Sequence, residues 1–99
     1  MVTDERNPVV LTEKDGKPLL TLQGSVDIFA AQELAHVARR ILERGEETVV
    51  CCENLHHLDC AGVQLLLALK KALVAKGKNI RIIKKSPQVE RLLAWTALS

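Results

Sequence analysis

The residues best suited to chemistry lie in one short stretch that contains His56, His57, Asp59 and Cys60. Imidazoles, carboxylates and thiolates are the ligands that zinc prefers, but known zinc sites separate their ligands by characteristic spacings that this stretch lacks. A thiol near a histidine also resembles an activated nucleophile, yet the sequence offers no third residue to orient the histidine. We therefore expect neither a metal site nor a catalytic residue here.

Cys60 keeps one chemical alternative open. It stands where a helix is expected to begin, and a cysteine at a helix N-terminus can be reactive. A redox role for Cys60 is therefore one hypothesis, and a solvated loop with no chemical role is the other. The rest of the sequence has no glycine-rich phosphate loop, no C-x-x-C pair and no H-E-x-x-H motif. We expect a protein that is not an enzyme and needs no cofactor.

The composition predicts a single domain, residues 1–99. Hydrophobic residues make up 47% of the 99 residues and charged residues 26%, which is ordinary for a globular domain. With one Phe, one Trp and no Tyr, the core must be aliphatic, and stacking on nucleic-acid bases is disfavoured. The formal net charge of +2 is too small to indicate a nucleic-acid partner.

Positive charge nevertheless gathers in the second half of the chain. The residues are Lys70, Lys71, Lys76, Lys78, Arg81, Lys84 and Lys85. We interpret them as a solvated helix end and strand flank rather than as a phosphate-binding patch. Lysines in the last turn of a helix also suit the negative end of its dipole.

The sequence predicts a cytoplasmic protein without membrane insertion. Its most apolar run, residues 61–75, is interrupted by polar side chains and is shorter than the ~18–20 apolar residues that a membrane helix needs. The polar N-terminus has no signal-peptide core. Adjacent residues in a strand point to opposite faces, so Cys51 and Cys52 are expected to be unpaired, buried thiols of a reducing compartment.

Hydrophobic periodicity and turn signals predict seven elements. Strands are expected at residues 9–13, 18–23, 48–52 and 79–83, and helices at residues 28–44, 61–76 and from 87 onward, with a turn at 15–17 and a loop at 53–60. Asp27 and Ser86 are expected to cap helices, and Gly45 to end one. The order β-β-α-β-α-β-α predicts an α/β fold: a mixed four-stranded sheet covered by three helices, or four, mainly on one face.

Three local patterns resemble motifs of STAS domains and occur in the same order along the chain. The family is named for sulphate transporters and anti-sigma-factor antagonists. Residues 24–27 (GSVD) resemble the family's turn between the second strand and the first helix. Residues 58–66 (LDCAGVQLL) are similar to the Asp-Ser-Ser/Ala-Gly-Leu segment that opens the second helix. Residues 86–93 (SPQVERLL) resemble the start of the final helix. The likeness covers nearly the whole chain and implies the STAS fold.

The resemblance implies regulated protein binding. In anti-sigma antagonists of the family, a Ser or Thr directly after the conserved Asp is phosphorylated by a partner kinase. Here Asp59 matches the Asp, Gly62 matches the glycine, and Cys60 occupies the acceptor position. Cysteine is not an acceptor for a serine kinase, so the usual switch is expected to be absent. Ser25 and Ser86 are remote substitutes, and Ser86 is better explained as a helix cap.

A second departure concerns the strand before this segment. Many relatives carry an acidic residue or Asn where this chain has Cys51, which argues against a nucleotide-related role for that surface.

The resulting functional expectation is a phosphorylation-independent adaptor in bacterial signal transduction, of the chemotaxis or histidine-kinase type. Its partner is another protein: a kinase-like regulator, a signalling-array component or a transporter ATPase. Alternatives are an anti-sigma-factor antagonist-like regulator, a redox-sensing variant, and a cytosolic subunit of an ABC-type transporter. The expected partner-binding residues are His56, His57, Asp59, Cys60, Ala61 and Gln64. Gln64 lies one helical turn after Cys60, so the two share a face.

Overall fold

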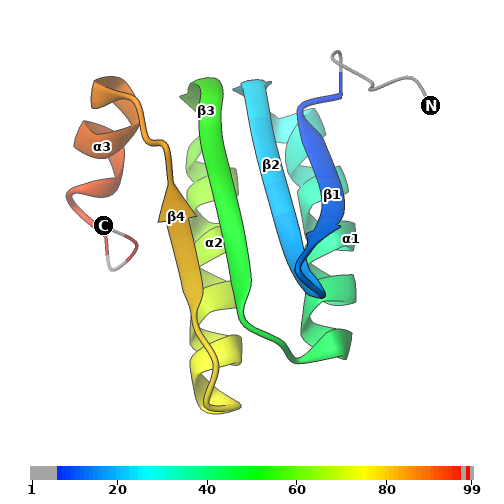
Figure 1. The fold of residues 1–99 in the computed structure, drawn as a ribbon. Helices are drawn as coiled ribbons and strands as arrows, with labels where there is room; N and C mark the ends of the chain where they lie inside the picture. Colours follow the sequence, from blue (N-terminus) through cyan, green and yellow to red (C-terminus); the bar gives the residue numbers. More distant parts are fainter. Residues whose placement is uncertain (1–6, 97, 99) are drawn as a thin grey trace.

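The computed structural model describes residues 7–96 and 98, which form one four-stranded sheet and three helices (Figure 1). In chain order these are β1 (Val9–Lys14), β2 (Lys17–Val26), α1 (Ile28–Arg44), β3 (Thr48–Leu58), α2 (Cys60–Ala75), β4 (Ile80–Ile83) and α3 (Pro87–Leu93). The predicted order of elements and the predicted α/β fold are confirmed.

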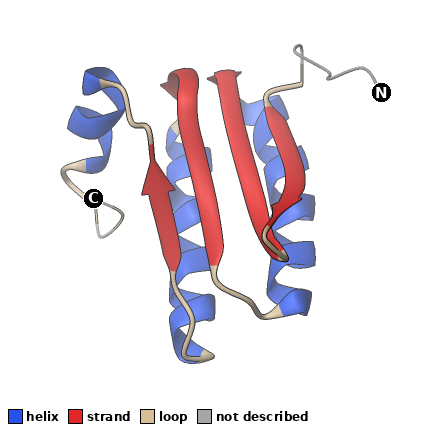
Figure 2. Ribbon diagram, viewed as in Figure 1, coloured by secondary structure: helices blue, strands red, loops and turns tan. Residues whose placement is uncertain are grey.

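The sheet is mixed, with its strands in the order β1-β2-β3-β4. β1 runs antiparallel to β2, whereas β2, β3 and β4 are parallel to one another. Helices α1 and α2 lie side by side against one face, and α3 lies beyond the β4 edge (Figure 2). None of the three helices in the described residues covers the opposite face of the sheet (Figure 2).

The hairpin between β1 and β2 turns through two residues. Asp15 and Gly16 both have positive φ, 55° and 78°, which is the backbone of a type I′ turn and suits the twist of the flanking strands. Lys14 pairs with Lys17 across the turn, and the register continues to Val9, opposite Leu22. The turn predicted at residues 15–17 is confirmed at Asp15 and Gly16, and Lys17 is already the first residue of β2.

Strands β2 and β3 are longer than predicted. The sequence indicated that Gly24 closes β2 and that residues 53–60 form a loop, but β2 continues to Val26 and β3 to Leu58. The extra segments pair with each other in parallel, with two register shifts along the way. These irregularities add residues to β3 and break the alternation of buried and exposed side chains, so that Leu55 and Leu58 are buried three positions apart.

Local sequence signals set the helix ends. The carboxylate of Asp27 accepts hydrogen bonds from the backbone N–H groups of Phe29 and Ala30, both at 3.0 Å, and caps α1. Gly45 ends α1 with φ 63°, a left-handed conformation that glycine adopts without strain. Ser86 caps α3 through the N–H of Val89 at 3.2 Å. All three predicted ends are confirmed.

The core is aliphatic, as the composition predicted, and lies between the sheet and the helices. The largest side chains that are fully buried are Leu20, Leu22, Leu34, Ile41, Leu55, Leu66, Leu69, Leu73 and Leu93. Cys52 is buried among them. Cys51, expected to be buried, is only half-buried, because α1, α2 and α3 all lie away from its face of the sheet. Within the described residues no helix is both long enough and apolar enough to span a bilayer.

Candidate functional site

The start of α2 is fastened to the ends of two strands. The backbone N–H of Asp59 donates to the carbonyl of Val26, at the end of β2, at 2.9 Å. The carboxylate of Asp59 accepts from the N–H of Cys60 at 2.8 Å, and its carbonyl accepts from Val63 at 3.1 Å. The position of this helix end is therefore fixed by backbone hydrogen bonds as well as by side-chain packing.

Gly62 allows this close approach. A Cβ atom added there would lie 2.6 Å from Cδ1 of Leu58 and 3.3 Å from Cγ1 of Val26. Both of these side chains are buried, so neither has free space into which it could move. The glycine thus lets the first turn of α2 rest directly on the ends of β2 and β3.

Asp59 is half-buried, whereas Cys60 and Gln64 are exposed, and Ala61 is half-buried between them. The helix begins at Cys60, one residue earlier than predicted. These four residues, Asp59, Cys60, Ala61 and Gln64, form the helix-start patch. The structure gathers them at one helix end, as the sequence predicted, and it places the thiol of Cys60 in contact with solvent.

The two histidines lie elsewhere than expected. His56 and His57 belong to β3 rather than to a loop, and both are exposed. With Gln88 and Leu92 of α3 they line a shallow hollow of about 310 Å³ between the end of β3 and α3. They border the helix-start patch along the chain, through Leu58. Across the described part of the chain, no cluster of three or more His, Cys, Asp or Glu side chains could hold a metal ion.

Two apolar residues near this end of the sheet were not singled out from the sequence. Ile28 and Phe29 open α1 directly after Asp27 and are 61% and 79% exposed. Because Val26 is hydrogen-bonded to Asp59, the first turns of α1 and α2 start next to each other. The sequence did carry a signal: Phe29 falls on the polar side of α1, at helical spacing from Glu33 and His36, where an aromatic residue has no core to enter.

The third helix adds further exposed apolar surface. Leu92 is 38% exposed, and Trp95, two residues after the end of α3, is 92% exposed. Large exposed apolar side chains that gather in one region of a protein mark interaction surfaces more often than isolated ones do. Here Ile28, Phe29 and Leu92 lie at or near the end of the sheet that carries the helix-start patch.

A family model described as the STAS domain matches residues 8–99. No curated protein matches the sequence. Several solved structures are similar in fold, and three of them are described here. The first is the anti-sigma factor antagonist SpoIIAA in its unphosphorylated form, with a TM-score of 0.77 and 21% identity over 91% of this chain and 81% of that one.

The second is SpoIIAA, a Bacillus cell fate determinant, in its phosphorylated form, with a TM-score of 0.74 and 20% identity over 91% and 84% of the two chains. The third is a STAS domain of an antisigma-factor antagonist from Rhodobacter sphaeroides, with a TM-score of 0.55 and 20% identity over 77% and 84%. At these identities the likeness establishes the shared fold.

Proposed function

This chain belongs to the STAS domain family, and we propose that it binds another protein through the helix-start patch, without catalysing a reaction and without a phosphorylation switch. The observation that carries the proposal is the exposed Cys60 directly after the capping Asp59. This is the position that the resemblance assigns to the phosphate acceptor, and a thiol replaces the hydroxyl that a serine kinase would modify. The surface then stays in its unphosphorylated state.

The surroundings of the patch support a protein partner. Interface centres are enriched in aromatic and large apolar residues surrounded by polar ones, and a few such residues carry most of the binding free energy. Phe29 and Ile28 supply exposed apolar area at the start of α1, close to Asp59, whose N–H is bonded to Val26. The patch is also held rigidly, so little conformational entropy is lost when a partner binds.

The proposed setting is bacterial signal transduction. Two structures of similar fold are of an anti-sigma factor antagonist, one of them phosphorylated. A domain of this fold that lacks the acceptor hydroxyl suits a constitutive adaptor, bound to a kinase-like regulator or to a chemotaxis-type signalling array. An ABC-type transporter ATPase and an anti-sigma factor are the alternative partners, and a cytoplasmic location is part of the proposal.

The proposal is tested first by finding the partner. A photo-crosslinking amino acid replaces Gln64 in the full chain, and in a control chain it replaces Lys71, an exposed residue two turns further along α2. We expect a protein that is crosslinked from position 64 and not from position 71. That protein is then purified, and its Kd is measured for the variants described next.

Cys60→Glu is the decisive variant. A carboxylate at the first position of α2 is compatible with the helix dipole, so the melting temperature should stay close to that of the wild type. A charge in the centre of the interface should weaken partner binding by about 2 kcal/mol, or roughly 30-fold. Lys71→Glu is the control and should bind as the wild type does. A folded Cys60→Glu variant with unchanged affinity contradicts the proposal.

The exposure of Cys60 also favours a second candidate, a redox-controlled interaction. Cys60→Ser separates the two. An adaptor that needs only the shape of this surface should bind its partner equally well with cysteine or serine at position 60. Mild peroxide treatment should then change the affinity of neither protein. A redox switch predicts instead that peroxide changes the affinity of the wild type and leaves that of Cys60→Ser unchanged.

A further inference from the structure

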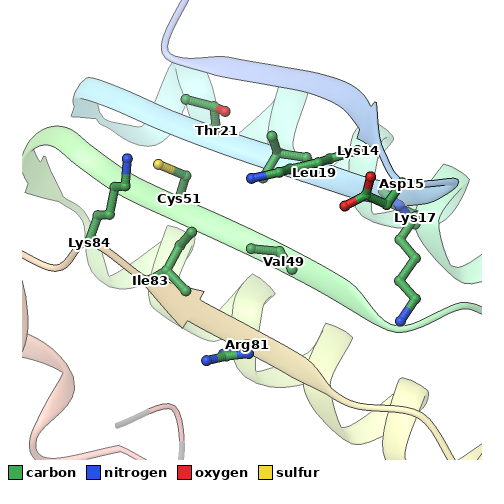
Figure 3. A pocket seen from close by; sticks show the side chains of 11 residues that line it. Lys14, Asp15, Lys17, Leu19, Thr21, Val49, Cys51, Arg81, Ile83 and Lys84 are labelled. Atoms are coloured by element: carbon green, nitrogen blue, oxygen red, sulfur yellow. The ribbon is translucent and has the colours of Figure 1, made fainter.

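The face of the sheet opposite the helices carries a basin built from three strands and the hairpin. The pairing register aligns Leu19 of β2 with Val49 of β3 and Arg81 of β4, and it aligns Thr21 with Cys51 and Ile83. Side chains two positions apart in a strand share a face, so these two rows form one surface. Figure 3 shows them together, on the face away from the translucent helices.

The floor of this basin is apolar, and the described part of the chain leaves it uncovered. Leu19, Val49 and Ile83 are each half-buried, and the thiol of Cys51 and the side chain of Thr21 complete the floor. Their immediate neighbours Leu20, Val50 and Ile82 turn toward the helices instead. The basin has a volume of about 480 Å³, which lies within the range of ligand-binding sites.

The rim of the basin is cationic. Lys14 and Lys17 flank the hairpin turn, and Arg81 and Lys84 stand at the β4 side. Asp15 is the one carboxylate among the lining residues that the structure describes. Among the described residues, Lys84 is the one rim cation with an ion-pair partner, Glu53 at 3.4 Å. Both of those side chains are more than half exposed, so that pair is weak and exchangeable.

We propose that this basin binds an acidic segment of a partner protein, one in which carboxylate side chains are interspersed with apolar ones. The apolar side chains would cover the floor, and the carboxylates would reach the rim. This second surface is separate from the helix-start patch and does not depend on the function proposed for it. Arg81 and Lys84, interpreted from the sequence as a solvated strand flank, are here given a partner.

The arrangement of the cations favours a peptide over a single small anion. Lys17 and Lys84 stand at opposite ends of the floor, and Arg81 lies along its β4 side (Figure 3). A lone phosphate would need donors that converge on one point. Cations spread around an apolar floor instead match several separate negative charges.

Two other occupants fit less well. A second copy of this chain, paired face to face about a two-fold axis, would bring two cationic rims together, and like charges oppose such pairing. A bilayer would be entered by the large exposed apolar side chains. Those side chains are Ile28, Phe29, Val74, Leu92 and Trp95, and the lining of the basin includes none of them.

The probe for the test is a fluorescein-labelled octapeptide in which glutamate alternates with valine, and the control probe has lysine in place of glutamate. Fluorescence anisotropy measures affinity, and backbone amide NMR locates the contact. We expect the acidic peptide to shift the amide signals of Leu19, Val49 and Ile83 and to leave those of Cys60 and Gln64 in place. We expect no binding of the lysine peptide.

Matched charge reversals separate a built site from general attraction. Lys17→Glu with Arg81→Glu should weaken binding by about tenfold or more, because both rim charges are reversed. Arg39→Glu with Lys71→Glu changes the net charge equally on exposed helix positions, and it should leave binding within about twofold. In a Cys60→Ser background, the acidic peptide should also slow the reaction of Cys51 with maleimide.

Several results would overturn the proposal. Equal weakening by the two double variants would mean attraction to net charge alone, and an absence of basin shifts at millimolar peptide would mean that there is no site. Displacement of the peptide by millimolar inorganic phosphate would indicate a small-anion site. Binding to phosphatidylglycerol vesicles that is lost with the same rim pair, without peptide binding, would indicate a membrane contact. Cys60→Glu should leave peptide binding unchanged, so the two proposals can fail separately.

Discussion

The end of the sheet at the start of α2 and the open face of the sheet are built in different ways. At the helix-start patch the backbone fixes the surface, through the hydrogen bonds of Asp59 and the close packing at Gly62. On the open face the backbone serves only as a support, and the basin is made by alternate side chains of β2, β3 and β4.

This difference predicts two kinds of recognition. A rigid patch beside the exposed aromatic ring of Phe29 should discriminate by shape and apolar burial, and mutations there should act mainly on the rate of dissociation. A cationic basin should act mainly through charge and should lose affinity as the salt concentration rises. A domain with both surfaces could hold two segments at once, which is what an adaptor requires and which raises the effective concentration of the second contact.

The largest expected effect tests whether the open face is open. Leu19 and Leu20 are neighbours in β2, but Leu20 is 0% exposed under the helices and Leu19 is half-buried in the basin. Leu20→Ala should lower the free energy of unfolding by about 3 kcal/mol, because it leaves a cavity in the core. Leu19→Ala should lower it by about 1 kcal/mol or less. Urea denaturation measures both.

A loss of stability in Leu19→Ala as large as that in Leu20→Ala would break the comparison, because it would mean that the face is covered in the native protein. Equal m-values for the two variants serve as the control that both unfold from comparably compact states.

The next effect concerns the other region. Phe29→Ala removes a ring that is 79% exposed, so the free energy of unfolding should change by less than about 0.5 kcal/mol. If the ring contributes to the surface around the helix-start patch, partner affinity should fall by about 2 kcal/mol, or roughly 30-fold. The measurement is the Kd for the crosslinked partner together with the melting temperature.

Trp95→Ala is the matched control for Phe29→Ala, since Trp95 is 92% exposed and follows α3 rather than opening α1. A loss of affinity in Trp95→Ala with none in Phe29→Ala would move the interface away from the first turns of α1 and α2, toward α3 and the hollow at His56 and His57.

The sequence predicted the fold well because each helix has local signals at its ends. Asp27, Gly45 and the Ser86-Pro87 pair act on residues no more than four positions away, so their effect can be read without knowing the tertiary structure. The sequence did not predict the second part of β3, residues 53–58, because its pattern of burial depends on pairing with a distant strand. Its residues pair with β2 across two register shifts, and the alternation that marks a strand is lost there.

The helix-start patch and the basin also differ in how far the sequence could predict them. Asp59, Cys60, Ala61 and Gln64 are close in the chain, and a helix of known phase brings them together, so the patch could be predicted. The basin joins Leu19, Val49 and Arg81, which are about thirty residues apart in turn, and only the register of the sheet shows that they meet. Phe29 was readable from its helical phase, as a departure from the apolar stripe of α1.

The smallest expected perturbation distinguishes the two regions and the core without changing stability. Cys60 is exposed on the patch, Cys51 is half-buried in the basin, and Cys52 is buried in the core. Burial, reinforced by Cys51, raises the pKa of Cys52 to about 11, so at pH 8 its thiol stays protonated and is a poor nucleophile. Maleimide should therefore modify Cys60 first, Cys51 next and Cys52 last, and mass spectrometry follows the three rates.

Single serine variants at positions 51 and 60 assign each rate, and denatured protein, in which all three thiols are accessible, is the control. If Cys52 reacted as fast as Cys51, the two faces of β3 would be equally accessible. That result would contradict the contrast between a covered core and an open basin.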